Sequence, residues 1–113
     1  MKKESKVLII GGGLAGLTSA IHLSLHQIPV ILIEKQSYPK HKVCGEYVSN
    51  EVLSYCKDLG IDPLAFGAKD INQFQFSGLS GKTIDVSLPL GGFGISRYTF
   101  DKVLYDRAIS LGV

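Results

Sequence analysis

Residues 7–23, VLIIGGGLAGLTSAIHL, combine a short apolar run, a cluster of glycines and a helical pattern. Residues 7–10 do not alternate between apolar and polar, which is typical of a strand buried on both faces of a parallel sheet. Beyond the glycines, apolar residues recur at the spacing of one helix face: Leu14, Leu17, Ile21 and Leu25. The stretch therefore predicts a strand, a tight turn and a helix.

A second apolar run, VILI at residues 30–33, directly follows Pro29. Two buried strands that are joined by a helix form a right-handed βαβ unit. We therefore predict an α/β fold that begins with a Rossmann-like βαβ unit.

The glycine cluster at residues 11–16 has the form GxGxxG. Gly11 permits the tight turn out of the strand, and Gly13 lets a pyrophosphate approach the backbone because it has no Cβ. Gly16 and Ala20 let the helix lie close to the sheet. The helix N-terminus offers unpaired N–H groups and a partial positive charge to the phosphates. The predicted phosphate-binding set is Gly11, Gly13, Leu14, Ala15 and Gly16.

Glu34 ends the second predicted strand, eighteen residues after Gly16. A carboxylate there can accept hydrogen bonds from both ribose hydroxyls of an adenosine, and it disfavours the 2′-phosphate of NADP. Dinucleotide binding is therefore predicted, and the expected cofactor-binding set also includes the neighbouring Lys35. The alternative is a glycine turn that only packs helix on sheet, with Glu34 in solvent. These residues leave open whether the nucleotide is FAD or NAD.

The middle of the chain predicts a loop followed by a helix. Residues 35–48 have the composition of a loop, and Ser49 or Asn50 can cap a helix that ends at Gly60. The apolar face of that helix is formed by Val52, Cys56 and Leu59. Cys56 is thus predicted to be a small core residue.

A small antiparallel strand pair is predicted next. Phe74 and Phe76 alternate with glutamines, as in a strand with one face in water, and residues 83–88 form the predicted partner strand. A flexible connection is expected at three glycines: Gly91, Gly92 and Gly94.

The last predicted element is a helix from Ser96 or Thr99 to Leu111. Arg97 lies at its start, where a cation opposes the helix macrodipole at a cost of roughly 0.3–1 kcal/mol. A nearby anion would remove this cost. The alternative is an exposed Arg97 that pairs with Asp101 four residues later.

Composition limits the classes of function that fit. The formal net charge of +2 and the absence of a basic stretch interleaved with aromatics exclude nucleic-acid binding. The two cysteines form no disulfide framework, no metal-ligand spacing is present, and a reducing, cytoplasmic setting fits best. Lys2, Lys3 and Lys6, followed by the apolar run from Val7, resemble the start of a signal peptide, but Glu4 and the glycine cluster argue against one. No apolar stretch is long enough to span a bilayer.

Four segments carry a resemblance to a known family. VLIIGGGLAGLTSAIHL and VILIEK, at residues 7–23 and 30–35, resemble the N-terminal FAD-binding segment of FAD-dependent oxidoreductases. HKVCGEYVS and ISRYTFDKVLYDRAISLGV, at residues 41–49 and 95–113, are similar to the geranylgeranyl reductase and aromatic-ring-hydroxylase group. The resemblance covers essentially the whole chain.

The resemblance implies FAD as the cofactor, with its pyrophosphate on residues 11–16 and its adenine ribose on Glu34. It also implies that Cys44 and Gly45 lie beside the flavin and that Arg97 reaches the FAD. Cys44 could tune the flavin, shape substrate access or act as a redox partner. The alternative is a thiol that is merely small and buried.

The implied activity is reduction of a lipid double bond or hydroxylation of an aromatic ring, with the flavin carrying the hydride. The substrate would be a small molecule, lipid or aromatic, and NADH or NADPH is a candidate electron donor. No catalytic side chain is identifiable. Three alternatives stay open: an NAD-dependent dehydrogenase, a non-catalytic dinucleotide-binding module, and a structural fragment that binds nothing.

Relatives in the resembling group are several times longer than this chain. They carry a later Gly-Asp segment that contacts the flavin ribityl chain and phosphate, and most of a substrate domain. We therefore expect residues 1–113 to be the N-terminal part of a FAD/NAD(P)-binding Rossmann-type domain, with no second domain and with the remaining polypeptide missing. Two parallel strands alone would leave apolar faces uncovered.

Overall fold

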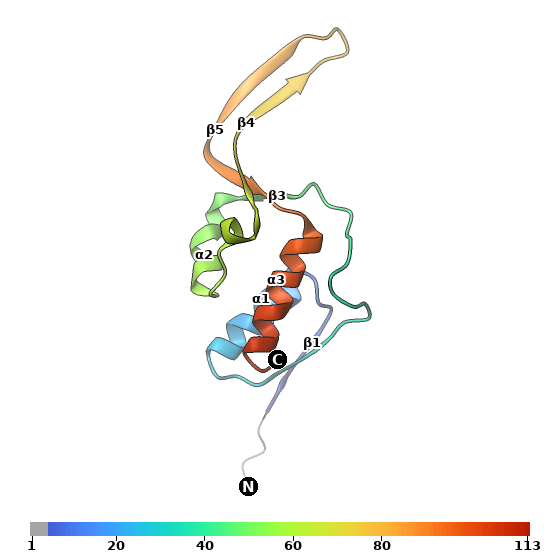
Figure 1. Cartoon of the computed structure of the whole chain (residues 1–113), viewed down its shortest axis with the longest axis vertical. Helices are drawn as coiled ribbons and strands as arrows, with labels where there is room; N and C mark the ends of the chain where they lie inside the picture. The colour runs from blue at the N-terminus through green and yellow to red at the C-terminus, as the bar shows by residue number, and fades with distance from the viewer. Residues whose placement is uncertain (1–4) are drawn as a thin grey trace.

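The computed structural model describes residues 5–113, so Lys2, Lys3 and Glu4 lie outside the described residues. Figure 1 shows two parts: the helices together with the N-terminal strand, and a long hairpin that projects away from them. No helix within the described residues is both long and apolar enough to cross a bilayer. The elements in chain order are β1 (Val7–Ile10), α1 (Leu14–Leu25), β2 (Val30–Ile33), β3 (Tyr47–Ser49), the 3₁₀ turn η1 (Asn50–Val52), α2 (Leu53–Asp58), the 3₁₀ turn η2 (Pro63–Phe66), β4 (Lys69–Ser77), β5 (Thr83–Gly94) and α3 (Arg97–Ser110).

The predicted βαβ unit is confirmed. Strands β1 and β2 are parallel, with Val7 opposite Val30 and Ile10 opposite Ile33, and α1 connects them. Helix α1 buries Leu17, Ala20 and Ile21, as its periodicity predicts. Leu25, predicted on the same face, is exposed because it lies in the last turn of the helix.

The prediction that both strands are buried on both faces is wrong for residues 5–113. The prediction that two parallel strands alone would leave apolar faces uncovered is confirmed. Ile10 is 80% exposed and Leu8 is 56% exposed, and Ile31 and Ile33 are also exposed. The cause is the size of the sheet, because the described residues provide only two parallel strands and helical cover for part of their surface. A parallel sheet normally requires cover on both faces.

The hydrophobic core lies between the helices and the base of β5. Helices α1 and α3 pack side by side (Figure 1), and Leu17 and Leu104 are among the most deeply buried residues. Phe93, at the end of β5, meets Phe100 of α3 edge to face, with ring centroids 6.3 Å apart. This contact joins α3 to the antiparallel sheet.

The helix predicted after residue 49 begins as η1 and continues as α2. The Ser49 hydroxyl accepts a hydrogen bond from the Glu51 N–H, and Gly60 ends the helix with a φ of +81°. Cys56 is buried, so its predicted core position is confirmed. The loop prediction for residues 35–48 is wrong at its end, because β3 begins at Tyr47 and pairs with β5.

The predicted strand pair is part of a three-stranded antiparallel sheet in the order β3-β5-β4. The expected flexible connection at Gly91, Gly92 and Gly94 is wrong, since all three lie within β5. Because Gly92 and Gly94 have no side chains, the side chains of Tyr47 and Ile71 can lie directly against this end of β5. A Cβ at Gly92 would overlap the Tyr47 ring, and one at Gly94 would lie 3.2 Å from Ile71 Cδ1.

The outer part of the hairpin has an apolar face, with Phe74 opposite Val86 and Phe76 opposite Ile84. The alternation predicted for β4 is therefore present in the pairing. All four side chains are nevertheless exposed, so both faces of the ribbon are in water. The prediction that only one face would be in water is wrong.

Helix α3 follows directly from β5. The Ser96 hydroxyl caps it by accepting a hydrogen bond of 3.1 Å from the Thr99 N–H, and Gly112 follows its end with a φ of +87°. The predicted helix is confirmed, and its first residue, Arg97, lies next to the glycine turn.

Candidate dinucleotide-binding site

An open cleft of about 560 Å³ lies where β1 passes into α1. Its lining comes from the end of β1, the glycine turn, the first turns of α1, the loop after β2 and the start of α3. The lining residues are Ile9, Ile10, Gly11, Gly13, Leu14, Ala15, Gly16, Ser19, Lys42 and Arg97. A second cavity of about 540 Å³ beside α2 is mostly apolar.

The N-terminus of α1 is left open to a ligand. Gly13 is the N-cap residue, no side chain caps the helix, and no acidic residue lies in its first turn. The backbone N–H groups of a first helical turn have no partner within the helix, and they attract anions together with the helix dipole. Lys42 and Arg97 also line the cleft; Lys42 adds a cation, and Arg97 adds guanidinium N–H donors, although its charge is balanced by Asp101. The arrangement fits a phosphate or diphosphate.

The three glycines of the motif are required for different reasons. Gly11 has a φ of +105°, which L-residues with a side chain rarely adopt. A Cβ at Gly16 would overlap the carbonyl oxygen of Gly11, whereas a Cβ at Gly13 would meet no atom within 4 Å. Gly16 is thus needed by the fold, and the space above Gly13 is left free for a ligand.

Glu34 is tied to the glycine turn by its carboxylate. Oε2 accepts a hydrogen bond of 2.7 Å from the Gly12 N–H, and Oε1 accepts one of 3.0 Å from the Gln36 N–H. Lys40 Nζ lies 3.1 Å from Oε2. These donors, with the Gly12 N–H as the largest contribution, lower the pKa of Glu34 to about 2. Glu34 is therefore ionised and ordered, rather than free in solvent.

The pH dependence of stability should reveal the contribution of the ionised Glu34 carboxylate. Because the folded pKa of Glu34 is below its ordinary value of 4.5, its contribution to stability is complete above pH 4.5 and is lost as the pH falls towards 2. We expect Glu34→Gln to be less stable than the unmodified chain at pH 7, and their melting temperatures to converge by pH 2. Circular dichroism melts at a series of pH values measure this. A constant difference across the range would contradict the pKa assignment.

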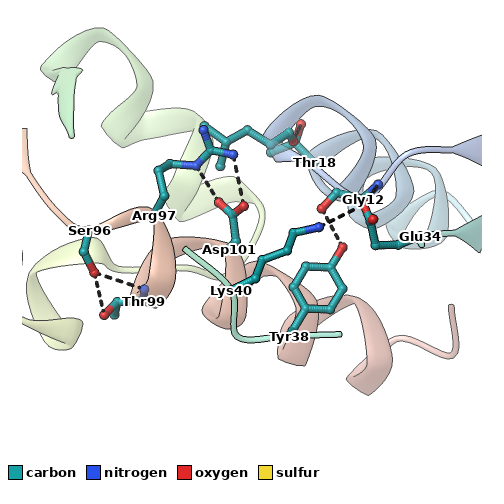
Figure 2. Close-up of polar contacts among 10 residues, drawn as sticks. Gly12, Thr18, Glu34, Tyr38, Lys40, Ser96, Arg97, Thr99 and Asp101 are labelled. Carbon is teal, nitrogen blue, oxygen red and sulfur yellow. Dashed lines mark hydrogen bonds and ion pairs between the residues drawn. The ribbon is translucent and has the colours of Figure 1, made fainter. Parts of the chain in front are cut away.

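Gly12 is held on its other side by Tyr38 (Figure 2). The Tyr38 hydroxyl donates a hydrogen bond to the Gly12 carbonyl oxygen, and its ring stacks on Tyr105 of α3 with a centroid distance of 4.4 Å. A Cβ at Gly12 would overlap the Tyr38 hydroxyl and lie 3.0 Å from Glu34 Cβ. Gly12, Tyr38 and Lys40 were absent from the predicted site. The one sequence signal for the role of Gly12 was that it is a glycine at all, because GxGxxG allows any residue at this position.

Arg97 and Asp101 form a buried ion pair with two parallel hydrogen bonds (Figure 2). Arg97 Nε lies 2.7 Å from Oδ1 and Nη2 lies 3.0 Å from Oδ2. The hydrogen bond to Asp101 is the main cause of the raised pKa of Arg97. The alternative of an exposed Arg97 that pairs with Asp101 is right about the pairing and wrong about the exposure, because Arg97 is 8% exposed and Asp101 is fully buried. Arg97 also lines the cleft, as its implied contact with the cofactor requires.

The remaining predicted site residues are not all brought to the cleft. Cys44 is exposed, so the alternative of a buried thiol is wrong, and the Glu46 N–H followed by Arg97 lowers its thiol pKa. Gly45 lines a separate pocket that it shares with Gly94. Lys35 is exposed, and nothing within residues 5–113 places it in the cleft. Nor do the described residues group three potential metal ligands.

Comparison with known proteins supports the resemblance to FAD-dependent enzymes. Residues 6–44 match a family model described as FAD dependent oxidoreductase. The resemblance to FAD-dependent oxidoreductases is confirmed. The chain is 33% identical to digeranylgeranylglycerophospholipid reductase 1 of Methanothermobacter thermautotrophicus, in an alignment that covers 99% of this chain and 29% of that protein.

Solved structures of an oxygenase and of a flavin-dependent brominase share the fold. The tetrameric form of 2-methyl-3-hydroxypyridine-5-carboxylic acid oxygenase superposes with a TM-score of 0.83 at 28% identity, covering 98% of this chain and 30% of that one. A flavin-dependent brominase gives a TM-score of 0.79 at 26% identity and covers 96% and 28%. The Rossmann-like α/β fold class is thereby confirmed. The chain spans less than a third of the length of each of these proteins.

Proposed function

We propose that this chain binds the ADP half of FAD and is the FAD-binding portion of a flavin-dependent oxidoreductase. The observation that carries the proposal is the open N-terminus of α1, where free space above Gly13 faces Lys42 and Arg97. The pyrophosphate would bind to the first-turn N–H groups. The adenine ribose would donate to Glu34, whose Oε1 accepts one hydrogen bond from the chain and has capacity for another.

In the complete protein, the bound flavin would supply hydride transfer to or from a substrate. The residues of this chain would bind and orient the nucleotide, and Arg97 would offer the guanidinium N–H groups that Asp101 does not occupy to its phosphates. The match to a digeranylgeranylglycerophospholipid reductase favours reduction of a lipid double bond, and the match to an oxygenase supports ring hydroxylation as the second candidate. We also propose that a nicotinamide nucleotide is the electron donor. Loss of the flavin absorbance on anaerobic addition of NADH or NADPH would test this.

The assignment of residues 1–113 to the N-terminal part of a FAD-binding domain belongs to the same proposal. Its support is the alignment, which covers nearly all of this chain and 29% of the reductase. A cytoplasmic setting is also proposed, on the support of two free cysteines, Cys44 and Cys56.

Titration with nucleotides tests the proposal directly. The purified 113-residue chain is titrated with FAD, ADP, NAD and NADP, followed by flavin fluorescence and calorimetry. We expect FAD and ADP to bind and NADP to bind most weakly, because its 2′-phosphate would meet the Glu34 carboxylate. Binding of NAD without FAD would favour the dehydrogenase alternative. Binding of no nucleotide would refute the proposal and favour a purely structural fragment.

Gly13→Ala should separate binding from folding. The new methyl group meets no protein atom within 4 Å, and the φ of −80° suits alanine, so we expect a loss of stability below about 1 kcal/mol. The same methyl group would occupy the space that the pyrophosphate needs. We expect the dissociation constant for FAD to rise at least about tenfold, or about 1.4 kcal/mol. Unchanged FAD affinity in a folded variant would argue against phosphate binding at this turn.

A further inference from the structure

The middle glycine of the turn is held through both of its backbone polar groups by the segment that follows β2. The Gly12 N–H donates to Glu34 Oε2 at 2.7 Å, and the Gly12 carbonyl oxygen accepts from the Tyr38 hydroxyl. Neither Glu34 nor Tyr38 belongs to the glycine turn. The orientation of the turn is therefore imposed by residues more than twenty positions later in the chain.

The geometry of the peptide group links Tyr38 to the cleft. In a planar trans peptide, the carbonyl and the N–H point in opposite directions. Tyr38 draws the Gly12 carbonyl towards itself, so the N–H of the same peptide, which belongs to Gly13, points away from Tyr38. Gly13 lines the cleft and Tyr38 does not. We propose that Tyr38 is a positioning residue that directs the Gly13 N–H at a phosphate of the cofactor.

Tyr38 is itself fixed well enough to act in this way. Its ring stacks on Tyr105 of α3, and Lys40 Nζ lies 5.0 Å from the ring centroid on its way to Glu34 (Figure 2). Burial, with smaller contributions from the Glu34 and Asp101 charges, raises the pKa of Tyr38 to about 12. The hydroxyl stays protonated at physiological pH and remains a donor to Gly12. The glycine turn is thereby joined to the helix that carries Arg97.

The same contact explains why three glycines occur in a row. A side chain at Gly12 would overlap the Tyr38 hydroxyl, although the Gly12 position is unrestricted in GxGxxG. The proposal rests on nucleotide binding at this cleft and adds a residue that no motif identifies.

The first test compares ligands with and without phosphate. Tyr38→Phe keeps the ring and its stacking and removes only the hydroxyl. Loss of one hydrogen bond worth about 1 kcal/mol should weaken ADP and FAD binding about fivefold. Adenosine, which lacks the phosphates, should bind the variant as it binds the unmodified chain. A merely structural role of Tyr38 would weaken adenosine and ADP alike.

Tyr105→Phe is the matched control, because it removes a hydroxyl from the stacking partner and leaves the Gly12 contact intact. Its affinity for ADP should be unchanged. The Gly13 amide signal in ¹⁵N spectra should shift in Tyr38→Phe and stay in place in Tyr105→Phe. Equal ADP affinity in Tyr38→Phe and the unmodified chain would overturn the inference and leave the proposed function standing. If the unmodified chain binds no ADP, the proposed function fails, and this inference fails with it.

A rescue experiment tests the contact without any ligand. Gly12→Ala places a methyl group against the Tyr38 hydroxyl and should lower the melting temperature. Adding Tyr38→Phe removes the overlapping atom, and the remaining contacts, 3.0 Å to Glu34 Cβ and 3.2 Å to Glu34 Cγ, need a shift of only a few tenths of an ångström. The double variant should therefore melt at a higher temperature than Gly12→Ala alone. No rescue would show that Tyr38 does not hold Gly12 and would overturn the inference, whatever the binding results.

Discussion

Gly16→Ala is expected to destabilise the chain by about 3 kcal/mol or more, enough to prevent cooperative folding of a small domain. The added Cβ would overlap the Gly11 carbonyl oxygen and lie 3.4 Å from Ile9 Cγ2. The overlapping atom belongs to the backbone, so α1 would have to move away from the end of β1. The better helix propensity of alanine, about 1 kcal/mol, offsets only part of this cost.

Gly13→Ala provides the comparison, because it adds the same methyl group to the same turn in open space. Thermal and urea unfolding followed by circular dichroism should give a normal transition for Gly13→Ala and a weak or absent one for Gly16→Ala. Equal midpoints for the two variants would show that α1 does not pack against the turn as described.

Asp101→Asn is expected to cost about 3–5 kcal/mol, because it leaves the Arg97 guanidinium buried without its counter-charge. Asparagine keeps the shape of the carboxylate but loses the charge that holds both guanidinium hydrogen bonds. Asp101→Asn should also weaken ADP binding, because Arg97 lines the cleft and would no longer be held in place. Urea unfolding measures the stability, and ADP titration measures the effect on binding.

The same helix offers a matched control for this variant. Lys102 and Asp106 form an ion pair with the same spacing of four residues, but both side chains are exposed. Asp106→Asn should change stability by less than about 0.5 kcal/mol. If the two variants lose similar stability, burial is not what makes the Arg97–Asp101 pair important.

Local patterns were sufficient to predict much of the fold. The apolar runs at 7–10 and 30–33 and the glycine spacing between them predicted β1, α1 and β2, because each signal depends on residues within one turn or strand. The capping residues Ser96 and Gly60 also placed helix ends correctly. Most of the cleft lining in the glycine turn was predicted for the same reason, since backbone N–H groups at a helix start are a property of the motif itself.

Burial and partnership were decided by tertiary structure. Whether β1 is covered depends on the strands and helices around it. Whether Gly92 and Gly94 form a loop or a strand depends on pairing with β3, which lies far away in the sequence. The roles of Gly12 and Tyr38 likewise arise only when the loop after β2 folds back on the glycine turn. A side chain's periodicity records which face of its own element it occupies, but not which distant group will meet that face.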